Sequence, residues 1–228
     1  MSRNTQSDIR TNAYVLRRTN YGEADRILNL ITPNGKISAI AKSVRKEKSK
    51  LSGGVEMFSL IDVNIHVGKG DMGTVTSAKM LKYYNNIVTS LPRMELAALV
   101  LKKMSLAAEH SDSPEFFKIV DQTLSAINDS IPPEVVEAWF WFNLAKASGE
   151  QINLYRDVEG DKLDPESNYI WDAQEEALMV RPGGDITADE IKIMRLILTA
   201  DLAVVLRVKG LCEKIAPILR IARAVAKV

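Results

Sequence analysis

The stretch RILNLITPNGKISAIAK, residues 26–42, contains two runs of strand-forming residues joined by a Pro-Asn-Gly turn. In the second run apolar and polar side chains alternate, with Ile37, Ala39 and Ala41 on one face. This alternation is typical of a strand that buries one side, and Pro, Asn and Gly favour tight turns. We therefore predict two strands joined by a tight turn.

Three more strand-like runs lie on either side of this pair, at residues 13–16, 60–67 and 74–81. A glycine-rich link at residues 68–73 joins the last two. Five short strands within roughly 70 residues favour a small closed barrel, and the OB-fold is the commonest five-stranded solution.

The periodicity changes after residue 83, where apolar side chains recur at helical spacing. Pro92, Ser113, the Pro132-Pro133 pair and a Thr187/Glu190 capping box provide helix-start signals. The predicted helices are residues 94–107, 115–127, 135–147, 188–198 and 211–225. Between the third and fourth we expect a long irregular loop at about 149–185, with a small hairpin formed by residues 169–171 and 177–180.

The sequence thus predicts an α+β protein in which a five-stranded OB-fold barrel precedes an α-helical C-terminal domain. We place the OB-fold barrel at residues 1–83 and the helical domain at residues 84–228.

The net charge of +1 conceals an uneven distribution along the chain. Residues 1–83 carry 14 Lys/Arg and 7 Asp/Glu, and the rest carries 16 Lys/Arg and 22 Asp/Glu. The barrel half is therefore strongly basic and the helical half acidic, which points to a polyanionic partner for the barrel.

Composition excludes several classes of protein. Cys212 is the only cysteine, and His66 and His110 are the only histidines, so we expect neither a disulfide framework nor a metal site. The polar N-terminus lacks the apolar core of a signal peptide, and no run reaches the length of a membrane span. We expect a cytoplasmic protein without a cofactor.

The segment 42–50 is the most basic part of the chain, with five Lys/Arg against one acid, Glu47. Such side chains neutralise phosphates and release counterions, which gives affinity without sequence preference. Short basic runs are also common in loops that are merely solvated, and Arg26 has Glu23 and Asp25 as alternative partners. The predicted DNA-binding residues are Arg17, Arg18, Arg26, Lys36, Lys42, Arg45, Lys46, Lys48 and Lys50.

Aromatic side chains that would stack on bases are few in this half. Tyr21 precedes Gly22 in a predicted turn and is the candidate for exposure, whereas Tyr14 and Phe58 lie in or beside strand runs and are assigned to the core. Stacking is the weaker expectation here.

An enzyme is the first alternative class. The chain has no phosphate loop and no HExxH motif, and the spacing Gly68-x-Gly70-x-x-Gly73 links two strands instead of opening a helix. His66 is a candidate general base but has no obvious partner. The carboxylates between 157 and 164 are candidates for a divalent cation, and a solvated acidic loop is the preferred interpretation. We therefore predict no enzymatic activity.

Five segments of the N-terminal half stand out together: YVLR at 14–17, YGEADRIL at 21–28, TPNGK at 32–36, AKSVR at 41–45 and KSKL at 48–51. In their order and spacing these segments resemble the N-terminal barrel of the RecO family of recombination mediators. Members of this family often have glycine at the position of Ser43. Many also carry four zinc-binding cysteines in the loop that corresponds to about 149–184, which has none here. We expect packing to hold this loop, through Tyr155, Tyr169, Trp171 and Met179; a partner surface is the alternative role of the aromatic residues.

This resemblance implies a role in DNA repair. RecO-like proteins bind single- and double-stranded DNA, anneal complementary strands and work with RecR to load RecA onto strands coated by single-stranded-DNA-binding protein. The acidic C-terminal tail of that coating protein docks on the helical domain, and the expected location is the cytoplasm, at the nucleoid. Basic residues available for docking are Lys102, Lys103, Lys146, Arg195, Arg207 and Lys209, and ordinary surface charge is the alternative interpretation of each. The alternative is an OB-fold module that binds RNA or serves as a protein adaptor, because charge does not separate DNA from RNA.

Overall fold

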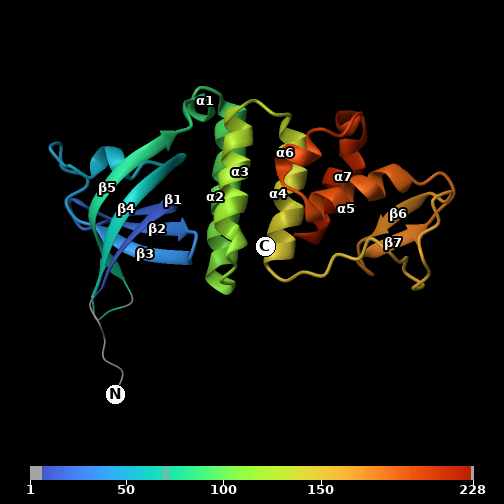
Figure 1. Ribbon diagram of the computed structural model, residues 1–228, viewed down its shortest axis with the longest axis horizontal. Helices are drawn as coiled ribbons and strands as arrows, with labels where there is room; N and C mark the ends of the chain where they lie inside the picture. Colours follow the sequence, from blue (N-terminus) through green and yellow to red (C-terminus); the bar gives the residue numbers. More distant parts are fainter. Residues whose placement is uncertain (1–6, 69, 71, 227–228) are drawn as a thin grey trace, which may run out of the picture. The chain divides into compact units, whose positions relative to one another are not determined.

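The computed structural model describes residues 7–68, 70 and 72–226 (Figure 1). Residues 1–6 of the polar N-terminus, and Lys69 and Asp71 of the glycine-rich link, lie outside the described residues. The chain divides into two compact units, Met1–Asp129 and Ser130–Val228, and each is described by itself below.

The first unit is built on a closed barrel with the strand order β1-β2-β3-β5-β4. All neighbouring strands are antiparallel except β3 and β5, which close the barrel in parallel through Ala39 opposite Gly73 and Ile40 opposite Thr74. The strands are β1 (Ser7–Tyr21), β2 (Asp25–Thr32), β3 (Gly35–Ala41), β4 (Ser59–Val67) and β5 (Gly73–Tyr83). The predicted five-stranded OB-fold barrel followed by helices is confirmed.

Alternating apolar residues fill the barrel. Along β4 the side chains of Ile61, Val63 and Ile65 are fully buried and the residues between them are not, as expected for a strand with one face in the core. They pack with Leu28 and Leu30 of β2 and with further apolar residues of β1, β3 and β5. This apolar interior holds the barrel closed.

Strand β1 begins earlier than the predicted run at residue 13. Its first half is polar on the outside, where Arg10 pairs with Asp62 of β4 at 2.6 Å and Asp8 lies 2.7 Å from His66 Nδ1. Sequence periodicity gave no apolar alternation there, because cross-strand pairing rather than burial defines this half of the strand. His66 therefore has a partner, and both members of the pair lie at the surface.

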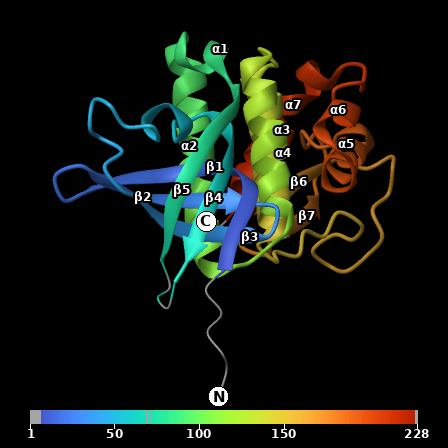
Figure 2. The same cartoon turned by 60° about the vertical axis from the view of Figure 1, so that its left-hand side comes forward.

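Three helices complete the first unit: α1 (Asn85–Val88), α2 (Leu91–His110) and α3 (Glu115–Asn128). Ser113 Oγ accepts a hydrogen bond from the Glu115 backbone N–H at the start of α3. Helices α2 and α3 pack together and against β1, and α3 also contacts β2; Figure 2 shows both helices beside the barrel. Residue 83 ends the last barrel strand, but the compact unit continues to Asp129.

A partly buried polar cluster joins α3 to the barrel. The Tyr14 hydroxyl (β1) donates to Asp121 of α3, and the Tyr84 hydroxyl lies 2.9 Å from that of Tyr14 and 3.5 Å from Asp121. Burial, followed by the hydrogen bonds with Asp121 and Tyr84, raises the pKa of Tyr14, and burial is the main cause that raises the pKa of Tyr84 to about 12. Both hydroxyls therefore stay protonated at neutral pH and can act as donors.

The second unit is helical and carries one small hairpin. Its elements are α4 (Pro133–Ala147), β6 (Tyr169–Asp172), β7 (Ala177–Val180), α5 (Ala188–Thr199), α6 (Leu202–Val205) and α7 (Leu211–Val225). The predicted capping box is present: Thr187 caps α5, and its backbone N–H donates to Glu190 at 2.9 Å. Short helices α6 and α1 were not predicted, since four residues give no readable period.

Helix α4 is the centre of this unit. It is buried along most of its length and packs against α5 and α7. Glu137 accepts two 2.7 Å hydrogen bonds from Arg223 of α7 and one from Trp141. Burial alone would raise the pKa of Glu137, but these hydrogen bonds outweigh it and hold the pKa below its ordinary value. The acid is therefore charged and fixes α7 on α4.

The predicted loop with its hairpin is present between α4 and α5. Tyr169 is buried, and its hydroxyl accepts from the Asp164 backbone N–H at 2.7 Å, so packing holds this part of the loop as expected. The expectation fails for Tyr155, whose residue is 62% exposed. Among the carboxylates of the loop, Asp157 accepts from the backbone N–H groups of Glu159 and Asp161 and so stabilises a turn.

No helix within the described residues is long and apolar enough to cross a bilayer. The same part of the chain contains no group of three or more His, Cys, Asp or Glu side chains placed to hold a metal ion.

Candidate nucleic-acid interface

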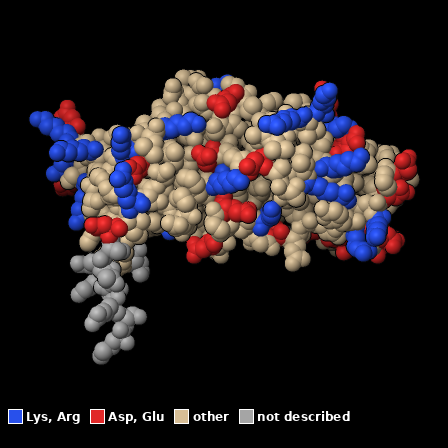
Figure 3. All heavy atoms as spheres, viewed as in Figure 1, with Lys and Arg blue, Asp and Glu red and all other residues tan. Residues whose placement is uncertain are grey.

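The basic loop, residues 42–50, leaves the barrel after β3 and presents its cations to solvent. Five side chains are exposed, and none of them pairs with a carboxylate among the described residues: Lys42, Arg45, Lys46, Lys48 and Lys50. Figure 3 shows Lys and Arg side chains, with some acidic ones among them, over the part of the barrel where the β3–β4 connection lies in Figure 1. Uncompensated cations on one loop form a surface suited to phosphates.

The β3–β4 connection is fixed to the barrel although it contains only one short helical turn, Ser52–Gly54. Val44 and Val55 are buried in the barrel core. Gly54 lies so close to β5 that a Cβ on it would meet the Ala78 carbonyl oxygen at 2.4 Å. The loop cations therefore project from an ordered frame, which lowers the entropy lost when they bind a ligand.

The start of the basic loop is hydrogen-bonded to the turn between β1 and β2. Asp25 Oδ1 accepts from the Ser43 backbone N–H at 2.6 Å, and the Ala24 carbonyl accepts from the Arg45 N–H at 2.9 Å. The Arg45 guanidinium also donates to the Gly22 carbonyl at 3.4 Å. Two connections that are 20 residues apart in sequence thus form one surface.

Ser43 has a left-handed backbone, with φ of 53°. This conformation is costly for residues with a Cβ and free of that cost for glycine. The chain turns at this position so that the Ser43 N–H reaches Asp25.

The other predicted cations differ in whether their charge is paired with a carboxylate. Arg26 lies opposite Ala41 at the start of the loop and donates to Asn20 at 3.3 Å, not to Glu23 or Asp25. Arg17 is exposed on β1 and has no carboxylate partner among the described residues.

Two predicted residues are already paired. Arg18 contacts Glu56 at 2.7 Å, and Lys36, largely buried, lies 3.7 Å from Glu109. Lys36 is also at the opposite end of β3 from the basic loop. Charge counting along the sequence did not reveal these pairs, because the partners are 38 and 73 residues away. Both cations contribute less to a phosphate-binding surface than the loop does.

The aromatic residues are placed as expected. Tyr21 is 55% exposed at the end of β1, directly before the turn to which the basic loop is hydrogen-bonded, and Tyr14 is buried. Tyr21 is therefore an exposed aromatic side chain available for stacking on a base. It is adjacent in sequence to Gly22, whose carbonyl accepts from Arg45 of the basic loop.

Asp25 is predicted to position the basic loop. Changing Asp25→Ala removes a carboxylate, and by charge alone this should tighten binding of a polyanion. Because the substitution also releases the Ser43 N–H and loosens the loop, we expect single-stranded DNA affinity to fall, by about tenfold. Fluorescence anisotropy with a labelled oligonucleotide measures the change.

Two matched variants separate position from charge. Asp25→Asn keeps an oxygen acceptor without the charge and should bind at least as tightly as the unmodified chain. Glu23→Ala removes an exposed carboxylate from the same turn and should behave in the same way. Equal or tighter binding by Asp25→Ala would show that the hydrogen bond does not position the loop.

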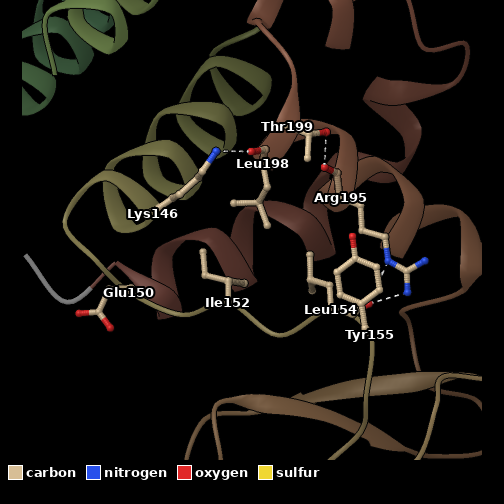
Figure 4. A pocket seen from close by; sticks show the side chains of 8 residues that line it. All are labelled: Lys146, Glu150, Ile152, Leu154, Tyr155, Arg195, Leu198 and Thr199. Atoms are coloured by element: carbon tan, nitrogen blue, oxygen red, sulfur yellow. Dashed lines mark hydrogen bonds between the residues drawn. The ribbon is translucent and has the colours of Figure 1, made fainter. Parts of the chain in front are cut away.

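The helical unit has an apolar pocket with a cavity volume of about 270 Å³, drawn in Figure 4. Ile152, Leu154 and Leu198 form apolar walls, and two cations lie at the pocket. Lys146 Nζ donates to the Leu198 carbonyl at 2.8 Å, and Arg195 donates twice to the Leu154 carbonyl, at 3.0 and 2.6 Å.

These bonds hold both positive groups without neutralising them. The Arg195 guanidinium also lies 4.3 Å from the centre of the Tyr155 ring, which explains the position of this exposed tyrosine. Glu150 also lines the pocket, but Figure 4 shows its carboxylate pointing away from Lys146 and Arg195. The side of the pocket near these two cations is therefore suited to an apolar group that carries a negative charge.

Comparison with known proteins agrees with this architecture. The family model "Recombination protein O N terminal" matches residues 6–84, which span the barrel. A DNA repair protein RecO of Dehalococcoides mccartyi is 32% identical over 212 residues, covering 89% of this chain and 83% of the relative. Another, of Alkaliphilus metalliredigens, is 30% identical over 208 residues, covering 90% of this chain and 83% of the relative. The chain belongs to the RecO family of DNA repair proteins.

Proposed function

We propose that this chain is a non-catalytic recombination mediator that binds single- and double-stranded DNA through its barrel. The observation that carries the proposal is the basic loop, whose five uncompensated cations are held on an ordered frame. With RecR as a partner, the chain helps RecA to replace single-stranded-DNA-binding protein at the nucleoid. Arg17 and Arg26 extend the interface, and Arg18 and Lys36 contribute less.

The mechanism requires only electrostatics and local concentration. Two complementary strands repel each other, and a positive surface that neutralises their phosphates lowers this repulsion, so the strands meet and anneal. A protein that holds both the DNA and the coating protein also raises the local concentration of each. Neither step breaks a covalent bond.

The pocket formed by Lys146 and Arg195 is the proposed docking site for the acidic C-terminal tail of the coating protein. Both cations were among the basic residues available for docking on sequence grounds, and they lie at one apolar pocket. An apolar side chain of the tail would fill the cavity, and its carboxylates would face the two cations.

We expect Lys146→Gln together with Arg195→Gln to weaken binding of the coating protein by about tenfold. Glutamine keeps a donor for the backbone carbonyls, so the fold is preserved while both charges are lost. Calorimetry with the intact coating protein should show this loss of affinity. With a form of the coating protein that lacks its acidic tail, the double variant and the unmodified chain should bind equally. An unchanged affinity for the intact protein would place docking elsewhere. DNA affinity serves as the control and should not change.

Annealing of coated strands tests the proposed function as a whole. Two complementary oligonucleotides, each covered by single-stranded-DNA-binding protein, should pair faster when this chain is added. The variant Arg45→Ala/Lys46→Ala/Lys48→Ala/Lys50→Ala should accelerate pairing much less, and a matched RNA pair measures the preference for DNA. No acceleration by the unmodified chain would contradict a mediator role.

A further inference from the structure

A second cavity lies in the first unit, between strand β1 and helix α2, and nothing described above uses it. Its volume is about 430 Å³, within the range of sites that take small ligands. We call it the β1–α2 groove. Leu16 and Arg17 line it from β1, Met57 from the β3–β4 connection, and Leu101, Lys102 and Leu106 from α2.

The walls of the groove are mostly apolar and adaptable. Leu16 sits where the pairing of β1 with β2 shifts its register, between Val15 and Arg17. A β-bulge of this kind redirects a side chain and is common beside functional sites. The Met57 thioether adjusts its shape to different partners, so the groove is suited to flat apolar groups of several sizes.

Two cations at the groove are uncompensated. Arg17 and Lys102 are exposed, and neither pairs with a carboxylate among the described residues. The one carboxylate that lines the groove, Glu109, already lies 3.7 Å from Lys36. The groove therefore combines an apolar floor with net positive charge.

We propose that the β1–α2 groove accepts one unstacked base of single-stranded DNA, with its flanking phosphates at Arg17 and Lys102. The proposal rests on the DNA-binding function above and extends it to discrimination between single and double strands. A single strand can turn a base outward, whereas a base in a duplex is paired and stacked and leaves the helix only at a cost.

The groove and the proposed phosphate-binding surface share the β3–β4 connection. Met57 belongs to the same β3–β4 connection as the basic loop, and Arg17 precedes Arg18, which is paired with Glu56 of that connection. A strand that crosses the basic loop thus has an apolar recess beside its path. Bases enter it without sequence preference, since every base has an apolar face.

Filling the groove is the direct test. Ala98 lines it from α2 and is exposed, so Ala98→Phe occupies the recess without removing a cation or a core side chain. Met94→Phe, one turn earlier on α2 and outside the groove, is the matched control. Affinities are measured for an oligothymidine, for a duplex of equal length, and for the same single strand with abasic sites.

We expect Ala98→Phe to weaken single-strand binding at least about fivefold and to change duplex binding less than about twofold. Met94→Phe should change neither, and on the abasic strand Ala98→Phe should bind like the unmodified chain. Unchanged single-strand affinity, or equal losses for single strand and duplex, would overturn the proposal and leave the groove to another ligand, such as a peptide. Weak, salt-insensitive binding of both single-stranded and duplex DNA by the unmodified chain would instead overturn the DNA-binding function itself.

Discussion

Single-stranded DNA binding is expected to weaken by about two to three orders of magnitude at roughly 0.1 M salt when four cations of the basic loop become alanine. The four residues are Arg45, Lys46, Lys48 and Lys50. Each phosphate contact on a single strand makes the slope of log affinity against log salt steeper by about 0.7. Four contacts therefore raise the affinity by nearly three orders of magnitude when the salt concentration falls from 1 M to 0.1 M. Equilibrium anisotropy with a labelled oligonucleotide measures this loss.

The control must have the same change in net charge. Four exposed cations of the second unit become alanine in a parallel variant: Lys162, Arg181, Arg207 and Lys209. If the loop contacts phosphates directly, this variant should keep an affinity close to that of the unmodified chain. Equal losses in the two variants would mean that overall charge, and not the basic loop, governs binding.

The second large effect is expected on stability, at the cluster of Tyr14, Tyr84 and Asp121. Asp121→Ala should lower the free energy of unfolding of the first unit by about 3 kcal/mol. The two buried hydroxyls lose their charged acceptor and keep only each other, 2.9 Å apart. Tyr84→Phe should cost less, because the Tyr84 hydroxyl makes the longer contact with Asp121, at 3.5 Å.

Hydrogen exchange of peptides from β1 and α3 locates this effect in the first unit. Trp139, Trp141 and Trp171 all lie in the second unit, so the tryptophan fluorescence transition provides a separate signal for comparison. A double-mutant cycle between Tyr14→Phe and Asp121→Ala should give a coupling free energy of about 1 kcal/mol or more. Strictly additive losses would show that the cluster does not join α3 to the barrel.

The strands and most of the helices could be predicted because their signals are local. The alternation around Ile37 and Ala39 identified β3, and the Thr187 capping box identified the start of α5. Such features depend on residues a few positions apart, which periodicity and capping rules describe well.

What could not be predicted depends on distant partners. An apolar stripe on α2 and on α3 shows that one face of each helix is buried, but it does not identify the element that covers this face. In the structure both helices contact the barrel. Arg18 and Lys36 looked equivalent to the loop cations until their partners Glu56 and Glu109 were placed. The role of Asp25 was equally hidden, because it depends on the left-handed turn at Ser43.

The central claim is that the barrel binds nucleic acid through phosphate contacts, and a salt series on the unmodified chain tests it most directly. The five contacts of the basic loop alone predict that log affinity for single-stranded DNA falls with log salt with a slope of about −3.5, and further contacts make the slope steeper. Measuring affinity over a fourfold range of salt determines this slope. A slope near zero, or no measurable binding at low salt, would contradict the account and leave the exposed loop without its proposed ligand.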